Sequence, residues 1–206
     1  MFEFCSEFSY THQSYLQRMK SHDDERKLYP FLTKIFTQLP GDDLNFHTMV
    51  KSLTELEKFD FSKDVVIYDC VQDRDYPFWG RAFFSVNEKI YLCGNSVWKS
   101  IMKNDRKEIQ RVLLHELVHL YDKKVRNWNL FIPEDLACSE TRAYNLSSNC
   151  KGKNDCLTKL VRGSLEKCIA TKDMSVFDRE LLILEALKKC KNGQNFERFT
   201  ITTILN

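Results

Sequence analysis

Residues 105–126 have the sequence DRKEIQRVLLHELVHLYDKKVR, which is the best-defined element that the chain predicts. Asp105 and Glu108 have the spacing of a capping box, with Asp in place of the usual Ser or Thr. The apolar residues that follow recur at intervals of three and four: Ile109, Val112, Leu113, Leu117, Val118 and Tyr121. That period predicts one helix of about five turns, ending near Arg126 and Asn127.

The centre of this helix carries the pattern His115-Glu116-Leu117-Val118-His119. Side chains four residues apart on a helix lie about 40° apart around its axis, so both imidazoles can reach one ion. The Glu116 carboxylate lies beside that pair, where it can face a water without binding the ion itself. Two histidines, a third protein ligand and a position for water form a catalytic zinc site. The pattern predicts a zinc-dependent peptide hydrolase with Glu116 as general base. The alternative is two surface histidines on an ordinary helix.

A third zinc ligand is expected on the next predicted helix, which begins at Pro133. Glu140 lies 140 − 119 = 21 residues after His119, a separation that suits a helix–loop–helix return. Its carboxylate shares a helical face with apolar or small residues, and a buried carboxylate is costly unless a cation lies beside it. Pairing of Glu140 with a basic side chain is the alternative.

Two further charged residues are candidates for supporting roles. Asp122 follows His119 by one turn, so it could accept the distal N–H of that imidazole and fix its tautomer. It is also the second candidate for third ligand, and a solvated acid at the helix end is the remaining alternative. Arg142 is expected to pair with Asp122, or else to steady the oxyanion formed during hydrolysis.

The rest of the sequence predicts an α+β domain with a small twisted sheet and a helical C-terminal half. Helices are expected over 11–40, 45–58 and 154–191, the last interrupted around 168–172, with a strand over 65–68 and a hairpin over 83–93. We divide the chain into an N-terminal helical segment, 1–60, and the domain proper, 61–206. The strand from Lys89 to Leu92 is expected at an edge, where an extended substrate would add to it through Ile90, Tyr91 and Leu92.

Composition excludes some classes of function and leaves others open. The 31 basic and 29 acidic side chains leave a net charge of +2, which is not the excess of positive charge expected of a protein that binds nucleic acid directly. No stretch approaches the roughly 20 apolar residues of a membrane helix. The first seven residues, MFEFCSE, hold two acids and no apolar run, so a signal peptide or cleaved presequence is not expected.

The eight cysteines allow two interpretations, which composition does not separate. They could be unrelated buried thiols. They could also form a disulfide framework in an oxidising compartment, with a pairing that spacing does not reveal.

Several motifs together resemble a known family. They are His115 to Asp122, Trp128, Ala137 to Ser147 with Cys150, Leu92-Cys93-Gly94-Asn95, Asn154-Asp155-Cys156, Cys168, and Cys190 followed by Phe196 to Phe199. They resemble the mitochondrial inner-membrane metalloproteases that process subunit 6 of ATP synthase, whose animal members are also described as Ku-binding proteins. The likeness extends over about residues 65–200. Ile67 and Lys124 stand where these relatives usually carry cysteines, and the segment between Cys150 and Cys156 is shorter than theirs.

This resemblance implies a zincin fold, one catalytic zinc ion and residence in the mitochondrial intermembrane space, peripheral to the inner membrane. It also implies cleavage of the subunit 6 precursor and help in assembling the membrane sector of ATP synthase. Two other classes are kept as alternatives: an assembly chaperone with a vestigial metal site, and a nuclear Ku-interacting module.

Overall fold

The computed structural model of the chain describes residues 44–56, 58–68, 82–85, 88–93, 106–148, 150 and 152–191. Its helices are α3 (Leu44–Glu55), α4 (Phe61–Asp64), α6 (Arg106–Lys124), α7 (Pro133–Ser147), α8 (Asn154–Leu165) and α9 (Val176–Cys190), with a short 3₁₀ helix at Ile169–Thr171. The strands are β1 (Val65–Tyr68), β2 (Ala82–Phe84) and β3 (Ile90–Cys93). The α+β prediction is confirmed, and so are the strand over 65–68, the hairpin and the break between the last two helices. The helix expected over 11–40 lies outside the described residues.

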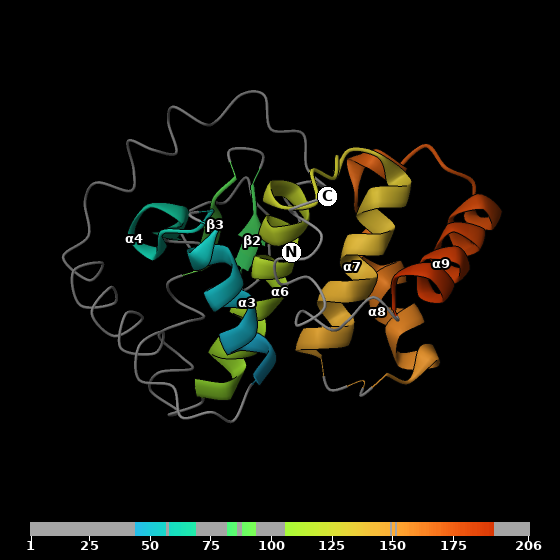
Figure 1. Cartoon of the computed structure of the whole chain (residues 1–206). Coiled ribbons are helices and arrows are strands. Elements are labelled where there is room, and N and C mark those ends of the chain that lie inside the picture. The colour runs from blue at the N-terminus through green and yellow to red at the C-terminus, as the bar shows by residue number, and fades with distance from the viewer. Residues whose placement is uncertain are drawn as a thin grey trace, which may run out of the picture.

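Helix α6 lies between two groups of elements, as Figure 1 shows. On one side it packs against α3 and the strands, and on the other side against α7, which α8 and α9 support. Contact on both sides buries nearly the whole middle of α6, including Leu113, Leu114, Leu117 and Val118. Any polar side chain in this stretch is therefore buried as well, and needs a partner.

The N-terminal part of the described chain shares this core. Phe46, Met49 and Leu53 of α3 belong to the same buried cluster as the apolar face of α6. These residues fall within the segment 1–60 that the sequence separates from the domain. The boundary at residue 60 stays a prediction, and the described part of the segment before it, α3, packs into the same core as α6.

The three strands form one sheet in the order β1-β3-β2. Strand β3 is parallel to β1 and antiparallel to β2, with Leu92 opposite both Ile67 and Ala82. The prediction that β3 is an edge strand is wrong, because both of its sides are already paired. Ile90, Tyr91 and Leu92 are also almost completely buried. The β3 backbone therefore cannot receive an extended substrate in the way we expected.

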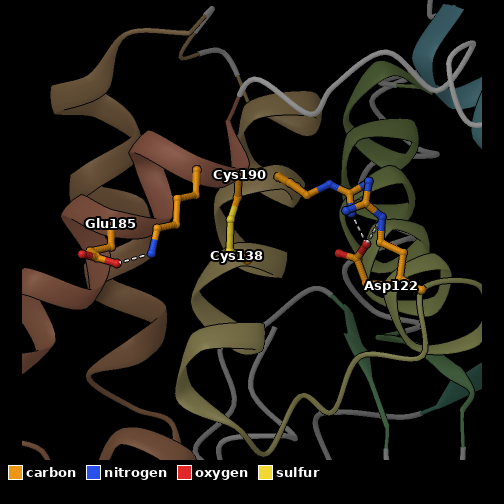
Figure 2. Close-up of a disulfide and its surroundings, with 7 residues drawn as sticks. Asp122, Cys138, Glu185 and Cys190 are labelled. Atoms are coloured by element: carbon orange, nitrogen blue, oxygen red, sulfur yellow. Dashed lines mark hydrogen bonds and ion pairs between the residues drawn. A yellow bond between two sulfur atoms is a disulfide. The ribbon is translucent and has the colours of Figure 1, made fainter.

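Disulfides and one ion pair join elements that are distant in the sequence. The bond between Cys138 and Cys190 ties α7 to the end of α9, as Figure 2 shows, and Cys150 bonds to Cys156 at the start of α8. Cys93 and Cys168 are disulfide-bonded too, so each of the cysteines that the structure describes is oxidised. Of the two interpretations of the cysteines, the disulfide framework holds for this part of the chain.

Lys124 makes a polar link at the end of α6. Its ammonium donates to the Lys58 carbonyl at 2.9 Å and lies 3.4 Å from Oδ1 of Asp64. Because Asp64 immediately precedes β1, this contact fastens the end of α6 to the first strand. Among the described helices, none is long and apolar enough to cross a membrane.

Candidate metal centre

Two histidines on successive turns of α6 point to the same side of the helix. Nε2 of His115 and Nε2 of His119 lie 3.1 Å apart, and the rings meet edge to face with centroids 4.8 Å apart. Both side chains are buried, as the packing on both sides of α6 requires. The four-residue spacing thus brings the two nitrogens together, as the helix period predicts.

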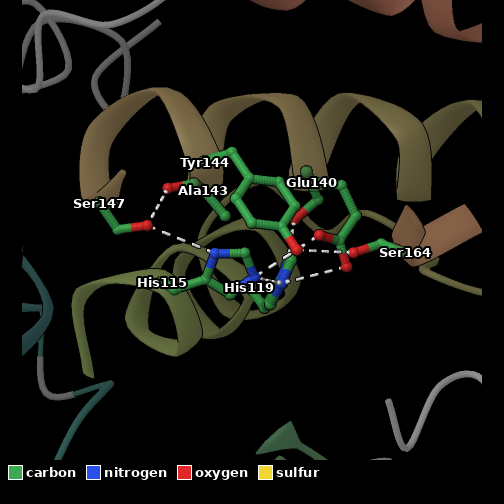
Figure 3. Close-up of polar contacts among 8 residues, drawn as sticks. His115, His119, Glu140, Ala143, Tyr144, Ser147 and Ser164 are labelled. Atoms are coloured by element: carbon green, nitrogen blue, oxygen red, sulfur yellow. Dashed lines mark hydrogen bonds and ion pairs between the residues drawn. The ribbon is translucent and has the colours of Figure 1, made fainter. Parts of the chain in front are cut away.

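Helix α7 brings the third donor to this pair. Asn127 adopts a positive φ of 57° and lets the chain turn at the end of α6, since Asn tolerates the left-handed region better than most residues. The loop is anchored by buried Leu130, and α7 starts with Pro133 in its first turn. Glu140 then lies two residues after the disulfide-bonded Cys138 and faces α6 (Figure 3).

The carboxylate of Glu140 lies against both imidazoles. Its Oε2 is 3.5 Å from Nε2 of His115, and its Oε1 is 3.6 Å from Nε2 of His119. One donor atom from each residue can be chosen so that all three lie within 4.8 Å of one another. Two imidazole nitrogens and one carboxylate oxygen, converging from two helices, are a donor set that suits a zinc-like divalent cation.

Burial sets the charge of these groups. It lowers the pKa of His115 from 6.5 to about 4 and that of His119 to about 3, although the charges of Glu116 and Glu140 respectively oppose this. Both rings are therefore neutral near pH 7, the form in which imidazole binds a metal. Burial also raises the pKa of Glu140, and its Oε2 has no hydrogen-bond partner within the described residues. A cation between these groups would remove that cost, so the donors fit a metal ion.

Glu116 and the pair formed by Asp122 and Arg142 occupy different positions around this centre. Glu116 is buried and directly follows His115 in α6, and its charge opposes the lowering of the His115 pKa by burial. Asp122 is completely buried and accepts a hydrogen bond from Nη1 of Arg142, which is 1% exposed. Of the two roles considered for Arg142, the structure contains the ion pair. Desolvation raises the pKa of Asp122, and the Arg142 charge opposes the shift.

Comparison with known proteins identifies the family. A model described as the peptidase M76 family matches residues 35–199 of the 206. The chain belongs to the peptidase M76 family. The match includes α6 and α7, and hence all three donor residues.

Several known proteins are similar to this chain at moderate identity. One named mitochondrial inner membrane protease ATP23, from Lodderomyces elongisporus, is 27% identical over 150 residues, which is 71% of this chain and 56% of that protein. The homologue of the same name from Danio rerio is 30% identical over 122 residues, 53% of this chain and 46% of that protein. The one from Xenopus laevis is 33% identical over 91 residues, 42% and 36% respectively. The chain spans about half the length of the relatives it matches. No solved structure matches it.

Two serine hydroxyls lie beside the histidines of the candidate metal centre in this M76 member. Sequence reasoning did not find these serines. Ser139 lies at Nδ1 of His119, the nitrogen for which we expected Asp122, at 2.7 Å. Ser147 lies 3.4 Å from Nδ1 of His115. Both serines are on α7. Ser147 lies seven residues after Glu140 and so shares its face, whereas Ser139 directly precedes Glu140 and lies about 100° around the helix axis from it. That spacing was the available signal, but serine is too common for it to be decisive.

A tyrosine completes the surroundings of His115. The ring of Tyr144 meets the imidazole edge to face with centroids 4.6 Å apart, and its hydroxyl lies 2.9 Å from Oγ of Ser164 on α8. Burial, reinforced by the charges of Glu140 and Glu116, raises the pKa of Tyr144 well above its ordinary value. The phenol therefore stays protonated and has a proton to donate in a hydrogen bond.

Proposed function

We propose that this protein is a zinc-dependent endopeptidase, with His115, His119 and Glu140 as zinc ligands and Glu116 as general base. The observation that carries this proposal is the convergence of three donor atoms, within 4.8 Å of one another, in the buried contact between α6 and α7. Membership of a peptidase family supports the choice of peptide hydrolysis over other metal-assisted reactions.

The residues of the site divide the chemistry among them. A bound zinc ion would act as a Lewis acid on the scissile carbonyl and lower the pKa of a water molecule. Glu116 follows His115 directly and lies beside the ligands, where its carboxylate takes the proton of the attacking water. The same carboxyl group then gives that proton to the leaving amine. Burial of the site excludes bulk water, which strengthens each of these electrostatic interactions.

The proposed substrate and location come from the likeness to relatives. Those relatives are named mitochondrial inner membrane proteases. We place this protein on the intermembrane-space side of that membrane, peripherally bound. Its disulfides suit an oxidising compartment. The proposed substrate is a protein, the precursor of ATP synthase subunit 6, and the proposed second role is assistance in assembling the ATP synthase membrane sector.

The test is the variant Glu116→Gln, which keeps the shape of the side chain and removes its basicity. Zinc content measured by mass spectrometry should equal that of the wild type, because Glu116 is not a ligand. Cleavage of the subunit 6 precursor should fall by about 10² to 10⁴-fold. The exposed Glu134 at the start of α7 provides a matched control, since Glu134→Gln removes a carboxylate outside the site.

Two results would contradict the proposal. Wild-type-like cleavage by the Glu116→Gln variant would rule out this residue as the base. Purified wild-type protein that binds no divalent metal would exclude the whole site. If the inactive variant still supports ATP synthase assembly in cells, the assembly role is separate from proteolysis.

A further inference from the structure

Each of the three proposed ligands is hydrogen-bonded to a different buried serine. Ser139 contacts His119, Ser147 contacts His115, and Ser164 contacts Glu140. We propose that these three serines are positioning residues that fix the ligands in the form and orientation that bind the metal. This inference rests on the proposed metal site and assigns residues to it that act through the ligands.

The geometry at Ser147 settles which nitrogen of His115 carries the proton. The Ser147 hydroxyl donates to the carbonyl oxygen of Ala143 at 2.6 Å, so its single hydrogen is already used. Toward Nδ1 of His115 the serine oxygen can only accept, and Nδ1 must therefore be the protonated nitrogen. The lone pair of the ring is then on Nε2, which faces the other donors (Figure 3).

Ser139 does the same for His119, but its hydrogen bond continues to a charged pair. The Ser139 hydroxyl is hydrogen-bonded to the Asp122 carboxylate, which can only accept. Its oxygen therefore accepts from Nδ1 of His119, again leaving the Nε2 lone pair for the metal. Asp122 is in turn held by Arg142. The predicted role of Asp122 in fixing this tautomer is thus carried out through one intervening hydroxyl.

Ser164 links the third ligand to α8. It hydrogen-bonds the carboxyl group of Glu140 and lies 2.9 Å from the hydroxyl of Tyr144. If the Ser164 hydrogen goes to the carboxylate, the protonated tyrosine donates to the serine oxygen. This arrangement holds one carboxylate oxygen in place while the other, Oε2, faces His115.

The experiment measures zinc affinity in Ser139→Ala, Ser147→Ala and Ser164→Ala by competition with a chromogenic chelator. Loss of a residue that orients a metal ligand typically costs 10 to 100-fold in affinity, and we expect a weakening of about that size. The bond at Ser139 is shorter than that at Ser147, 2.7 Å against 3.4 Å, so Ser139→Ala should have the larger effect of these two. A serine whose alanine variant binds zinc within about twofold of the wild type is not a positioning residue.

The matched control is Ser148→Ala. Ser148 follows Ser147 in the sequence, but its hydroxyl accepts from the backbone N–H of Cys150 at 3.2 Å and contacts no ligand. Its zinc affinity should equal that of the wild type. The absorption spectrum of the Co²⁺-loaded protein should change in the three test variants, which alter ligand orientation, and stay the same in the control.

Thermal unfolding of the metal-free proteins separates this role from a general loss of packing. An alanine variant with wild-type metal-free stability and weakened zinc binding supports positioning. Where alanine lowers that stability, a threonine variant, which keeps the hydroxyl, should restore the affinity together with the fold. Restored stability without restored affinity would overturn the assignment. The proposed function fails separately, if the wild type itself binds no zinc.

Discussion

At the scale of single residues, the polar groups of α6 are informative because of where they are buried. His115, Glu116 and His119 are at most 5% exposed, in a helix packed on both sides by apolar side chains. Burying such groups without partners costs several kcal/mol in total. The burial of these three polar side chains is therefore better explained by the site that they form than by a contribution to the stability of the fold.

Glu140 and Asp122 are two buried acids for which we predict opposite effects on stability. Asp122 compensates the buried guanidinium of Arg142, so Asp122→Asn should destabilise the metal-free protein by about 3 to 5 kcal/mol. Among the described residues Glu140 has no ion pair with Lys or Arg, only the two neutral histidines beside it, so Glu140→Gln should leave the stability of the metal-free protein equal or higher. Zinc affinity should follow the reverse order, with the greater loss in Glu140→Gln because that residue is a proposed ligand.

Urea unfolding with excess chelator measures the stabilities of the two metal-free variants, and competition with a chelator measures their zinc affinities. A Glu140→Gln protein that retains wild-type zinc affinity would exclude Glu140 as a ligand. If Asp122→Asn loses more affinity than Glu140→Gln does, Asp122 would take its place.

Glu140 could be predicted because its distance from His119 and its apolar helical face indicated a buried acid on the next helix. The histidine pair could be predicted because helix geometry converts its four-residue spacing directly into position. The serines could not. Whether Ser139 meets His119 depends on how α7 crosses α6, and this crossing is set by side-chain packing between helices that the sequence does not reveal. Asp122 was expected to accept the distal N–H of His119, but the Ser139 hydroxyl lies at that nitrogen instead.

At the scale of elements, the error over β3 has a physical cause. The run Ile90-Tyr91-Leu92-Cys93 is continuously apolar, and all four side chains are buried. Such a run is typical of a strand covered on both faces and paired on both sides, whereas a half-exposed edge strand alternates. The hairpin with β2 could be predicted because it is local. The parallel pairing with β1 brings together residues about 25 positions apart, and no local signal specifies it.

The two described disulfides should differ in how much they stabilise the fold. Cys138 and Cys190 are 52 residues apart, whereas Cys150 and Cys156 are 6 apart. Loop-closure entropy then gives about 4 kcal/mol for the first bond and about 2 kcal/mol for the second. Urea unfolding of the Cys138→Ala/Cys190→Ala and Cys150→Ala/Cys156→Ala proteins should show this order.

Loss of the longer bridge should also reach the metal centre. Cys138 precedes Ser139 and Glu140 directly, so freeing α7 from α9 loosens the helix where it supplies two of the groups around the site. We expect weaker zinc binding in the Cys138→Ala/Cys190→Ala protein than in the other double variant. Equal zinc affinity in the two would mean that packing alone holds α7.

At the scale of the whole molecule, the ligands come from both sides of one contact. His115 and His119 belong to α6, which packs with α3 and the sheet, while Glu140 belongs to α7, which packs with α8 and α9. A metal ion bound by all three would therefore join the two groups of elements seen in Figure 1. Binding to the native state alone stabilises it by RT ln(1 + [L]/Kd), or about 2.7 kcal/mol when zinc exceeds Kd by 100-fold.

Removing the metal should accordingly lower the unfolding temperature by roughly 5 to 10 °C for a chain of this size. The effect should disappear in Glu140→Gln, which cannot join the two sides. Amide hydrogen exchange should locate the change, with protection lost in α6 and α7 around the ligands and retained in α3 and α9, which hold no ligand. Uniform loss of protection would indicate that the ion binds at another site and stabilises the protein from there. Confinement to the two ligand-bearing helices would mean that the cation is itself part of the contact between α6 and α7.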